Sequence, residues 1–408
     1  MKEIKRWAVN QVDKALGIWR CVYVAGARQC GKTTLCRQCN ELETEYRTLD
    51  DSMLLRVART DPAGFVKHSG KTLVVDEVQK APELLPEIKM AVDRDPAKGQ
   101  YLLTGSVNLP LLPAVTESLA GRMGTIRLRT LAEGEIRGVE PTFVRRAFAR
   151  DFPAVFSELG KRDVLEIAMR GGYPEAMELD RESRIEWFRS YLDSLLLHDI
   201  RNLMDVHAFR TLRDLAEAML ARSARFFANN EISAALAIKH ETLVRFQSIL
   251  KMLFLVEEIP AWTKSDYDGI VKRSKWFASD TGMMASVLGW RENDVCFDDD
   301  RSGKAVESWV HHELAAQADA AGGVRLFHYR DQKKREIDFV MEAADGSLVG
   351  VEVKAGSAVR PDEFKHLTWF RDNLAGGRNF TGLVLYTGNV TVGFGEGLYA
   401  VPVAALCS

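Results

Sequence analysis

The chain has 408 residues, of which 46% are apolar and 27% charged, and this length suits roughly two to three domains, each with its own core. Such a composition excludes disordered, collagen-like and small disulfide-rich proteins. The 55 basic and 57 acidic residues nearly cancel, so any binding of nucleic acid requires a local basic patch.

Sequence signals for a membrane or an oxidising compartment are weak. No apolar run reaches the ~18 residues of a membrane span, and the charged start lacks the apolar core of a secretory signal. The six cysteines are too few and too unevenly spaced for a disulfide framework. We therefore expect a cytoplasmic protein with no membrane partner.

The hydrophobic pattern changes along the chain and predicts an α/β protein. Short apolar runs alternate with helical stretches up to about residue 135, which indicates a parallel sheet. A helix-rich part follows, then two helices with two extended pieces, and finally a long helix combined with strands and a second helix. The expected divisions are 1–145, 146–225, 226–290 and 291–408.

The first apolar run, Cys21–Ala25, leads into a loop that fits G-x-x-x-x-G-K-[ST] in full and then into a helical stretch. In such a loop the glycines let successive backbone N–H groups curl around phosphate oxygens. Lys32 would reach the β- and γ-phosphates of ATP, and the Thr33 hydroxyl would bind Mg²⁺. The predicted nucleotide-binding residues are Gly26, Ala27, Arg28, Gln29, Cys30, Gly31, Lys32, Thr33 and Thr34.

A second apolar run, Thr72–Val75, ends in two carboxylates, Asp76 and Glu77. Beside a phosphate loop, Asp76 would lie near the coordination sphere of Mg²⁺. Glu77 would orient and deprotonate the attacking water. A solvated acidic turn is the alternative interpretation of this pair.

Two later segments carry further catalytic candidates. The run Tyr101–Leu103 ends in Thr104 and Ser106, whose hydroxyls could sense the γ-phosphate or the attacking water. Arg122 follows in a loop and could be a finger that reaches the nucleotide of a neighbouring subunit, where it would stabilise transition-state charge. A strand-end turn and a surface arginine are the respective alternatives.

The blocks GARQCGKTT, TLVVDEVQ, YLLTGS and SLAGR, in this order and spacing, resemble the AAA+ ATPases of a large bacterial and archaeal family. The later RGGYPEA, EIDFV and VEVKAG are also similar to blocks of that family, so the resemblance covers almost the whole chain. It implies an AAA+ core with a helical lid, binding of ATP with Mg²⁺, and hydrolysis. Members carry a C-terminal domain of poorly defined function, so no biological role is implied. Pro174 resembles the Gly-x-Pro lid element of signal-transducing ATPases, which packs near the adenine; a helix-capping turn is the alternative.

Residues 226–290 predict two helices followed by a β-hairpin, which is the pattern of a winged helix. The second helix, Glu241–Met252, has an apolar stripe and a broad polar side, so it could enter a major groove while cations of the wing contact phosphates. Winged helices also serve as packing or protein-contact modules, and nearby acidic residues dilute the basic signal. The candidate DNA contacts are Thr242, Arg245, Ser248, Lys251, Lys272, Arg273 and Lys275.

An Asp-Gly pair between two alternating runs predicts a hairpin near the C-terminus. Cross-strand partners share a face, so we expect the apolar set Ile337, Phe339 and Met341 to meet the apolar set Val349, Val351 and Val353. The same register brings together, on the opposite face, Asp338, Glu352 and Lys354. Two carboxylates beside a lysine suit a Mg²⁺ ion and activation of a water molecule, whereas a solvated polar face is the alternative.

The spacing Asp-x13-Glu-x-Lys resembles the PD-(D/E)xK nuclease superfamily, which implies a restriction-endonuclease-like α/β domain. Glu307, on the preceding helix, matches the auxiliary helical acid of that superfamily. The chain departs from the pattern at one point, because Glu336-Ile337 rather than proline precedes Asp338. Cleavage of phosphodiesters and an inactive nuclease-like domain both remain open.

Together these patterns predict an ATP-hydrolysing AAA+ protein that acts on DNA, with hydrolysis coupled to movement of the winged-helix and nuclease-like domains. The alternative is a nucleotide-operated signalling or protein-remodelling switch, whose C-terminal domain is a non-catalytic binding platform for a protein partner. A finger supplied in trans implies a homo-oligomer.

Overall fold

The computed structural model describes residues 3–39, 44–106, 119–152, 157–200, 206–264 and 273–408. The chain divides into two compact units, the first formed by residues 1–131 with 252–254 and the second by residues 132–251 with 255–408. The finer divisions expected from the sequence stay predictions. Within the described residues, no helix has the length and apolar character needed to cross a membrane.

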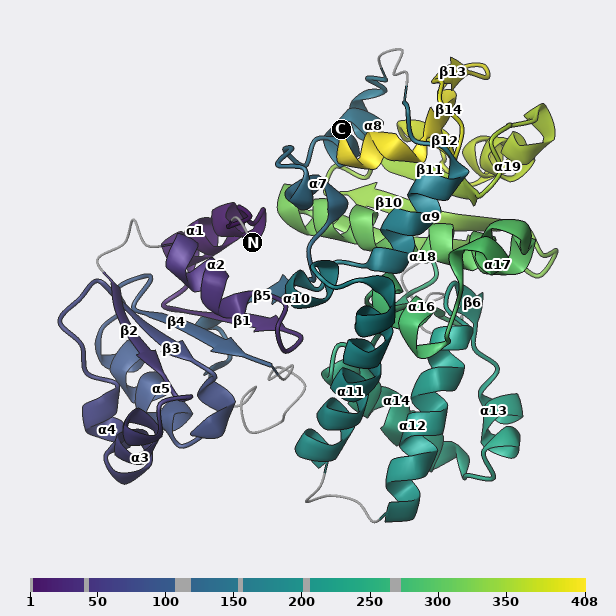
Figure 1. Ribbon diagram of the computed structural model, residues 1–408. Helices are drawn as coiled ribbons and strands as arrows, with labels where there is room; N and C mark the ends of the chain where they lie inside the picture. Colours follow the sequence, from purple (N-terminus) through teal and green to yellow (C-terminus); the bar gives the residue numbers. More distant parts are fainter. Residues whose placement is uncertain (1–2, 40–43, 107–118, 153–156, 201–205, 265–272) are drawn as a thin grey trace. The chain divides into compact units, whose positions relative to one another are not determined.

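A five-stranded parallel sheet forms the centre of the first unit (Figure 1). Its spatial order is β2-β3-β4-β1-β5. The strands are β1 Cys21–Gly26, β2 Thr44–Thr48, β3 Thr72–Asp76, β4 Tyr101–Gly105 and β5 Met123–Leu128. Strands β1, β3 and β4 are buried along their whole length, as near-continuous apolar runs in a covered parallel sheet should be. The three strands expected from apolar runs are thus confirmed, although β4 separates β1 from β3.

Short helices precede and connect these strands. They are α1 Ala8–Ile18, α2 Lys32–Gln38, α3 Ser52–Thr60, α4 Pro62–Phe65 and α5 Leu84–Arg94, with a 3-10 turn at Val78–Lys80. Helix α1 packs against β1 and β5, and α2 packs against β1 and β4. The helix that follows the phosphate loop is therefore fixed on two central strands.

The second unit begins with helices and contains a small antiparallel sheet. Among the described residues, the helices of this unit before α18 (Asp299–Ala321) are α7 Glu133–Ile136, α8 Phe143–Ala149, α9 Lys161–Arg170, α10 Pro174–Met177, α11 Arg181–Ile200, α12 Val206–Ala221, α13 Asn229–Ala235, α14 His240–Met252, α16 Thr281–Val287 and α17 Glu292–Phe297. The sheet has the order β6-β8-β7 and is formed by β6 Arg225–Phe226, β7 Val256–Ile259 and β8 Lys275–Ala278. In the part of the chain that the structure describes, α12 is followed by β6, α13, α14, β7 and β8.

A six-stranded mixed sheet forms the C-terminal part of the second unit. Its order is β13-β14-β12-β11-β10-β9. The strands are β9 Val324–Arg330, β10 Glu336–Ala343, β11 Leu348–Lys354, β12 Phe380–Tyr386, β13 Val392–Gly393 and β14 Leu398–Pro402. Helices α18 Asp299–Ala321 and α19 Lys365–Asn373 pack on it, with 3-10 turns at Pro361–Phe364 and Val403–Cys407.

The two helices cover opposite faces of this sheet. The Phe339 ring lies 6.1 Å from that of His311 on α18. On the other face, a Cβ at Gly350 would lie 2.8 Å from Leu367 of α19. Because Phe339 pairs with Val351 and neighbouring residues of a strand point to opposite faces, the sheet lies between α18 and α19.

The hairpin register agrees with the expectation for its central pairs but not at its end. Phe339 pairs with Val351 and Met341 with Val349, as the alternation predicts. Ile337, however, packs with Val340 in the cluster beneath α19, and the pairing of β10 with β9 shifts between these two residues. The expectation that Ile337 shares a face with Phe339 is therefore wrong, because a strand irregularity interrupts the alternation.

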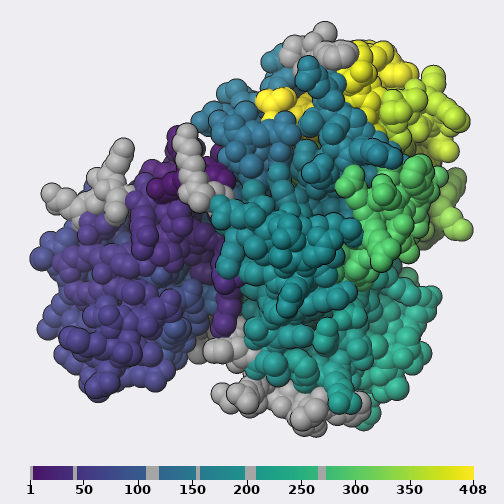
Figure 2. Space-filling model, viewed as in Figure 1, coloured from purple at the N-terminus to yellow at the C-terminus, as the bar shows by residue number. Residues whose placement is uncertain are grey.

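The residues that follow the first unit pack against the last strands of the chain. Arg150 Nη2 donates a 2.9 Å hydrogen bond to the Phe380 carbonyl, and the rings of Phe152 and Tyr399 lie 5.1 Å apart. The blue-teal residues beside the yellow C-terminal ones in Figure 2 belong to this contact. Both ends of the second unit thus contribute to one core.

Helix α18 passes through the centre of the second unit and carries a buried acid. Glu313 is 1% exposed, and its Oε1 accepts a 2.7 Å hydrogen bond from the backbone N–H of Glu133. Burial raises the pKa of Glu313 to about 8, although that backbone N–H opposes the shift. The folded chain therefore favours the protonated form of this carboxyl group.

This shift predicts a pH-dependent stability. Between its ordinary pKa of 4.5 and about 8, folded Glu313 holds a proton that the unfolded chain releases, so stability should fall as the pH rises through this window. Glu313→Gln removes this titration. As the pH rises from 5 to 8, we expect the free energy of unfolding of the wild type to fall by about 1 kcal/mol or more relative to that of the variant. Denaturant unfolding at both pH values measures the difference, and parallel pH profiles for the two proteins would contradict it.

Candidate functional site

The loop after β1 has the backbone geometry that its glycines predict. Gln29 and Gly31 both have positive φ, of 61° and 102°. A Cβ at Gly26 would lie 2.5 Å from the carbonyl oxygen of Leu128, so only glycine fits where β1 approaches the end of β5. The loop therefore curls at the carboxyl edge of the sheet, and Lys32 begins α2 immediately afterwards.

Arg6 stabilises this loop, although it was not among the site residues predicted from the sequence. Its guanidinium donates to the carbonyls of Cys30 and Arg129, both at 2.8 Å. The Cys30 thiol lies 3.7 Å from the Leu128 carbonyl. A buried arginine that donates to the loop and to the segment after β5 fixes the position of the loop carbonyls.

The Lys32 ammonium lies inside the loop. It donates to the carbonyls of Gly26 at 3.2 Å and of Ala27 at 2.9 Å, and it lies 3.7 Å from Glu77 Oε1. The side chain is buried, so its charge faces the space enclosed by the loop rather than bulk water. The remaining loop residues Arg28, Thr33 and Thr34 are half-buried or exposed.

Asp76 is the point at which three elements meet. Its Oδ2 accepts from the Thr33 hydroxyl at 2.9 Å and from the Tyr46 hydroxyl at 2.6 Å, and its Oδ1 accepts from the Thr104 hydroxyl. Burial and the bond to Asp76 raise the pKa of Tyr46 above its usual value, so this phenol stays a donor. Thr104, on the strand between β1 and β3, thus links Asp76 to the centre of the sheet.

Glu77 is held in a strained and well-defined position. Its φ of 61° is left-handed, and its backbone N–H donates to the Thr104 hydroxyl at 3.1 Å. Its carboxylate accepts from Gln79 and, at 3.4 Å, from Ser106. Gln79 also donates to Ser106 at 3.0 Å, and the sequence reading missed it. Thr104 and Ser106 therefore hold the two carboxylates, rather than lying at the surface as turn residues.

The predicted Mg²⁺ ligands are compatible with the ion. A threonine hydroxyl and a carboxylate oxygen 2.9 Å apart are hard oxygen donors of the kind that Mg²⁺ prefers. Among the described residues, no group of three or more His, Cys, Asp or Glu side chains is arranged to hold a metal ion by itself. Phosphate oxygens and water would thus complete the coordination, as in other phosphoryl-transfer sites.

Two predicted nucleotide contacts, Arg122 and Pro174, stay predictions. Arg122 forms an ion pair with Asp93 on α5, and it is partly exposed. Pro174 begins α10 in the second unit, so its adenine contact stays a prediction.

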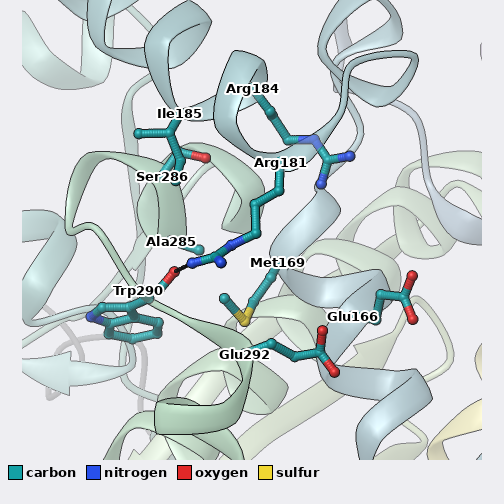
Figure 3. Close-up of a pocket in the computed structure, with 9 residues that line it drawn as sticks. All are labelled: Glu166, Met169, Arg181, Arg184, Ile185, Ala285, Ser286, Trp290 and Glu292. Carbon is teal, nitrogen blue, oxygen red and sulfur yellow. Dashed lines mark hydrogen bonds between the residues drawn. The ribbon is translucent and has the colours of Figure 1, made fainter.

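A separate pocket of about 230 Å³ lies in the second unit and is drawn in Figure 3. The two arginines that line it donate hydrogen bonds to backbone carbonyls. Arg181 donates to the Trp290 carbonyl at 3.1 Å, and Arg184 donates to the carbonyls of Ala176 and Leu179. These bonds indicate a structural role for both side chains.

The candidate DNA contacts have unequal access to solvent. Arg245, Ser248 and Arg273 are exposed and Thr242 is half-buried. Lys251 forms an ion pair with Glu258 at 2.5 Å. Lys272 lies outside the described residues.

Lys275 requires a correction. Its side chain is 1% exposed, so it is not available to contact a phosphate. The interpretation as a wing cation is wrong because β8 pairs with both β6 and β7, which places this residue inside the second unit.

Lys275 instead joins the C-terminal carboxylates. Its Nζ lies 2.5 Å from Glu307 Oε1, 2.9 Å from Asp338 Oδ1 and 3.3 Å from Glu336 Oε1. Glu352 lies nearby, and its Oε2 is 3.4 Å from Lys354 Nζ. The four predicted nuclease residues Glu307, Asp338, Glu352 and Lys354 do line one cleft of about 590 Å³, together with Glu336.

Burial and the charges of neighbouring groups both shift the pKa values in this cluster, and at several residues they act in opposite directions. Burial, together with the negative charge of Asp338, raises the pKa of Glu307 to about 8 and raises that of Glu352 well above its usual value. Burial would also raise the pKa of Asp338, but the Lys275 ammonium and the Val353 N–H outweigh it and lower this pKa. The same carboxylates outweigh burial at Lys275 and raise the pKa of its ammonium, which therefore stays charged.

Comparison with known proteins bears on the first unit. Residues 19–137 match a family described as an AAA domain. Residues 161–294 and 302–406 match two families described as domains of unknown function, DUF8612 and DUF4143. The AAA match and the phosphate-loop geometry support an AAA+ ATPase core, with a parallel sheet, in the first unit. The two other matches leave the winged-helix and nuclease-like interpretations untested.

The similar proteins and solved structures add little about function. Uncharacterised proteins of Mycobacterium bovis and Mycobacterium tuberculosis are each 24% identical over 354 residues, which is 86% of this chain and 74% of the relative. Among solved structures, AMPPCP-bound DnaA of Aquifex aeolicus is 15% identical with a TM-score of 0.30, covering 62% of this chain and 89% of its own. Thermotoga maritima RuvB is 16% identical with a TM-score of 0.27, covering 63% and 90%. At such scores neither likeness carries a functional argument.

The Asp76 geometry generates a prediction for Tyr46→Phe. The variant removes one donor to a carboxylate, a bond typically worth about 1.5–3 kcal/mol, and frees Asp76 to turn away from Thr33. We expect the Mg²⁺-dependent part of the affinity for a fluorescent ATP analogue to fall roughly tenfold, with binding in EDTA unchanged.

Tyr101→Phe is the matched control, because the Tyr101 hydroxyl donates to the Val66 carbonyl instead of a carboxylate. An equal loss in both variants, or no loss of Mg²⁺ dependence in Tyr46→Phe, would show that Tyr46 does not position Asp76.

Proposed function

We propose that the first unit binds ATP with Mg²⁺ and hydrolyses it, and that this cycle acts on DNA held by the second unit. The observation that carries the ATPase assignment is the convergence of Thr33, Tyr46 and Thr104 on Asp76, beside Lys32 and Glu77. It joins the phosphate loop to two carboxylates that come from a different strand.

Each residue of this set has a distinct task in the proposed reaction. The loop N–H groups and Lys32 bind the phosphates and stabilise charge on the γ-phosphoryl group. Thr33 and, through water, Asp76 would hold Mg²⁺, which neutralises charge on the phosphate oxygens. Glu77 orients the attacking water and accepts its proton, while Ser106 and Gln79 keep its carboxylate in place. Thr104 acts as a positioning residue through its bonds to Asp76 and Glu77.

The order of elements supports a winged helix as the DNA-contacting module. Helix α12, strand β6, helices α13 and α14 and strands β7 and β8 follow one another, and the three strands form one antiparallel sheet. In this arrangement α14 is the recognition helix, with Arg245 and Ser248 on its exposed side.

A basic cleft of the second unit also supports a polyanionic partner. It encloses about 870 Å³, and four of its lining residues are cationic, namely Arg273, Arg330, Lys333 and Arg335. Asp331 and Gln332 line it too, and Asp331 is paired with Arg335 at 2.6 Å. The Arg330 guanidinium lies 4.5 Å from the centre of the Phe226 ring. Clustered cations beside an aromatic ring fit a sugar–phosphate backbone, in a chain whose overall charge is near zero.

The second candidate function is a nucleotide-operated switch with a non-catalytic C-terminal domain. It is favoured by the Lys275 ammonium, which already neutralises the carboxylates that a nuclease would use for metal binding. In that case a protein partner takes the place of DNA. In both cases we propose a homo-oligomer in which Arg122 exchanges its bond with Asp93 for the nucleotide of a neighbouring subunit.

Glu77→Gln tests the hydrolytic assignment. The amide cannot accept the proton of the attacking water, so ATP turnover should fall at least 100-fold, whereas the affinity for MgATP should stay within about threefold of the wild type. Lys32→Ala should instead lose nucleotide binding. Glu83→Gln, at a half-buried glutamate that faces Arg59, is the control, and full turnover by Glu77→Gln would refute the assignment.

The DNA proposal is tested by ATP turnover and DNA affinity at several salt concentrations. Lys333→Glu should weaken binding to duplex DNA about tenfold or more and reduce the slope of log affinity against log salt by about 1. Lys98→Glu reverses an exposed charge in the first unit and should change neither quantity. If double-stranded, single-stranded and branched DNA all leave ATP turnover unchanged, the switch function is favoured instead.

A further inference from the structure

The C-terminal carboxylate cluster contains its own cation. The three N–H donors of the Lys275 ammonium face three acceptors, on Glu307, Asp338 and Glu336, at 2.5–3.3 Å. One of these, Asp338, is a carboxylate that the nuclease pattern assigns to a metal ion, and Glu307 is the auxiliary helical acid of that pattern. The ammonium therefore occupies the space between Glu307 and Asp338.

The position of Lys275 is determined by strand pairing rather than by a mobile side chain. Lys275 pairs with Ile259 of β7 and with Phe226 of β6. Its Nζ lies 5.9 Å from the centre of the Phe226 ring and 6.0 Å from that of Phe277. Buried between aromatic rings and carboxylates, the side chain can leave only if β8 moves.

Other oxygen atoms of the cluster also have interaction partners. Asp338 Oδ2 accepts a 2.9 Å hydrogen bond from the Val353 N–H, and Arg225 lies 3.9 Å from Glu307 Oε2. Together with Lys354, the cations nearly balance the carboxylates. Among the described residues, Glu352 Oε1 and Glu307 Oε1 are both buried without a hydrogen-bond partner, and the ammonium reaches Glu307 Oε1 as an ion pair.

A divalent cation does not fit this arrangement. Mg²⁺ needs carboxylate oxygens at about 2.0–2.1 Å in near-octahedral geometry, and Asp338 Oδ1 and Glu307 Oε1 already hold the ammonium. A second positive ion about 3 Å from Nζ would meet strong repulsion in a site sheltered from water. The residues predicted for a nuclease metal site are thus brought together, but with a lysine in the place of the metal.

We propose that Lys275 is the resident cation of this cluster and keeps divalent metal out, so that the cluster becomes a metal site only when Lys275 is withdrawn. Strand β8 then acts as a built-in lock on the C-terminal cleft. This inference does not depend on the ATPase proposal, because it concerns residues of the second unit alone.

Binding of Mn²⁺ to the full-length, nucleotide-free protein tests the lock, with free Mn²⁺ followed by electron paramagnetic resonance. Wild type and Asp338→Asn should bind Mn²⁺ alike, since the cluster contributes no site. Lys275→Met should gain one Mn²⁺ per chain, bound at least tenfold more tightly than any ion in the wild type. Lys275→Met combined with Asp338→Asn should lose that ion, which assigns it to the cluster.

Lys354→Met is the matched control, because it removes a neighbouring cation of the same cleft and leaves Lys275 in place. It should gain no Mn²⁺. Circular dichroism and thermal melting check that each variant folds, and Lys275→Gln is a second neutral variant that can still hydrogen-bond to the carboxylates.

Two results would overturn the proposal. One is a Mn²⁺ ion in the wild type that Asp338→Asn abolishes, because the cluster would then accept metal with Lys275 present. This comparison stands even if both neutral variants fail to fold. The other is a folded Lys275→Met or Lys275→Gln protein that binds no more Mn²⁺ than the wild type.

Discussion

The candidate ATPase site depends on one carboxylate. Asp76 lies at the end of a buried strand and accepts three hydroxyl donors, from the helix after the phosphate loop, from β2 and from β4. Because β4 lies between β1 and β3, the loop and the carboxylate follow strands that are not neighbours in the sheet. The hydroxyl groups of Thr33 and Thr104 link Asp76 across this distance. Neutral donors hold the group in place without cancelling its charge, so Asp76 is positioned yet still able to attract a cation.

The second unit also holds carboxylates in place, but with a charged partner instead of neutral donors. There, carboxylates at the end of β10 and on α18 meet a permanent ammonium instead of hydroxyl groups. Desolvation penalises isolated buried carboxylates heavily, and either a metal ion or a lysine can offset that penalty. The pairing at Asp338 is thus a stable ion cluster in its own right, whereas the set at Asp76 is one charge short of balance until a cation binds.

Sequence reasoning succeeded where the determinants are local. The phosphate loop depends on glycines and a lysine within eight positions, and the apolar runs ending in Asp76 and Thr104 are continuous enough to define buried strands. It missed Arg6, Tyr46 and Gln79, because Arg6, Tyr46 and the bond from Gln79 to Ser106 each join segments that are distant in sequence. The alternation of β10 likewise predicted the central pairs but not the irregularity at Ile337, which depends on pairing with β9.

Lys275 links the residues on the two sides of the expected boundary at residue 290. By sequence it belongs to the segment 226–290 and its acidic partners to 291–408, yet they form one ion cluster around its buried ammonium. Removing one partner of a buried ion pair typically costs about 3–5 kcal/mol, because a charge is left without a counter-ion. The two segments are therefore coupled through this cluster. A fragment that began at residue 291 would expose Glu307 and Asp338 without their ammonium, so its affinity for metal would not represent that of the whole chain.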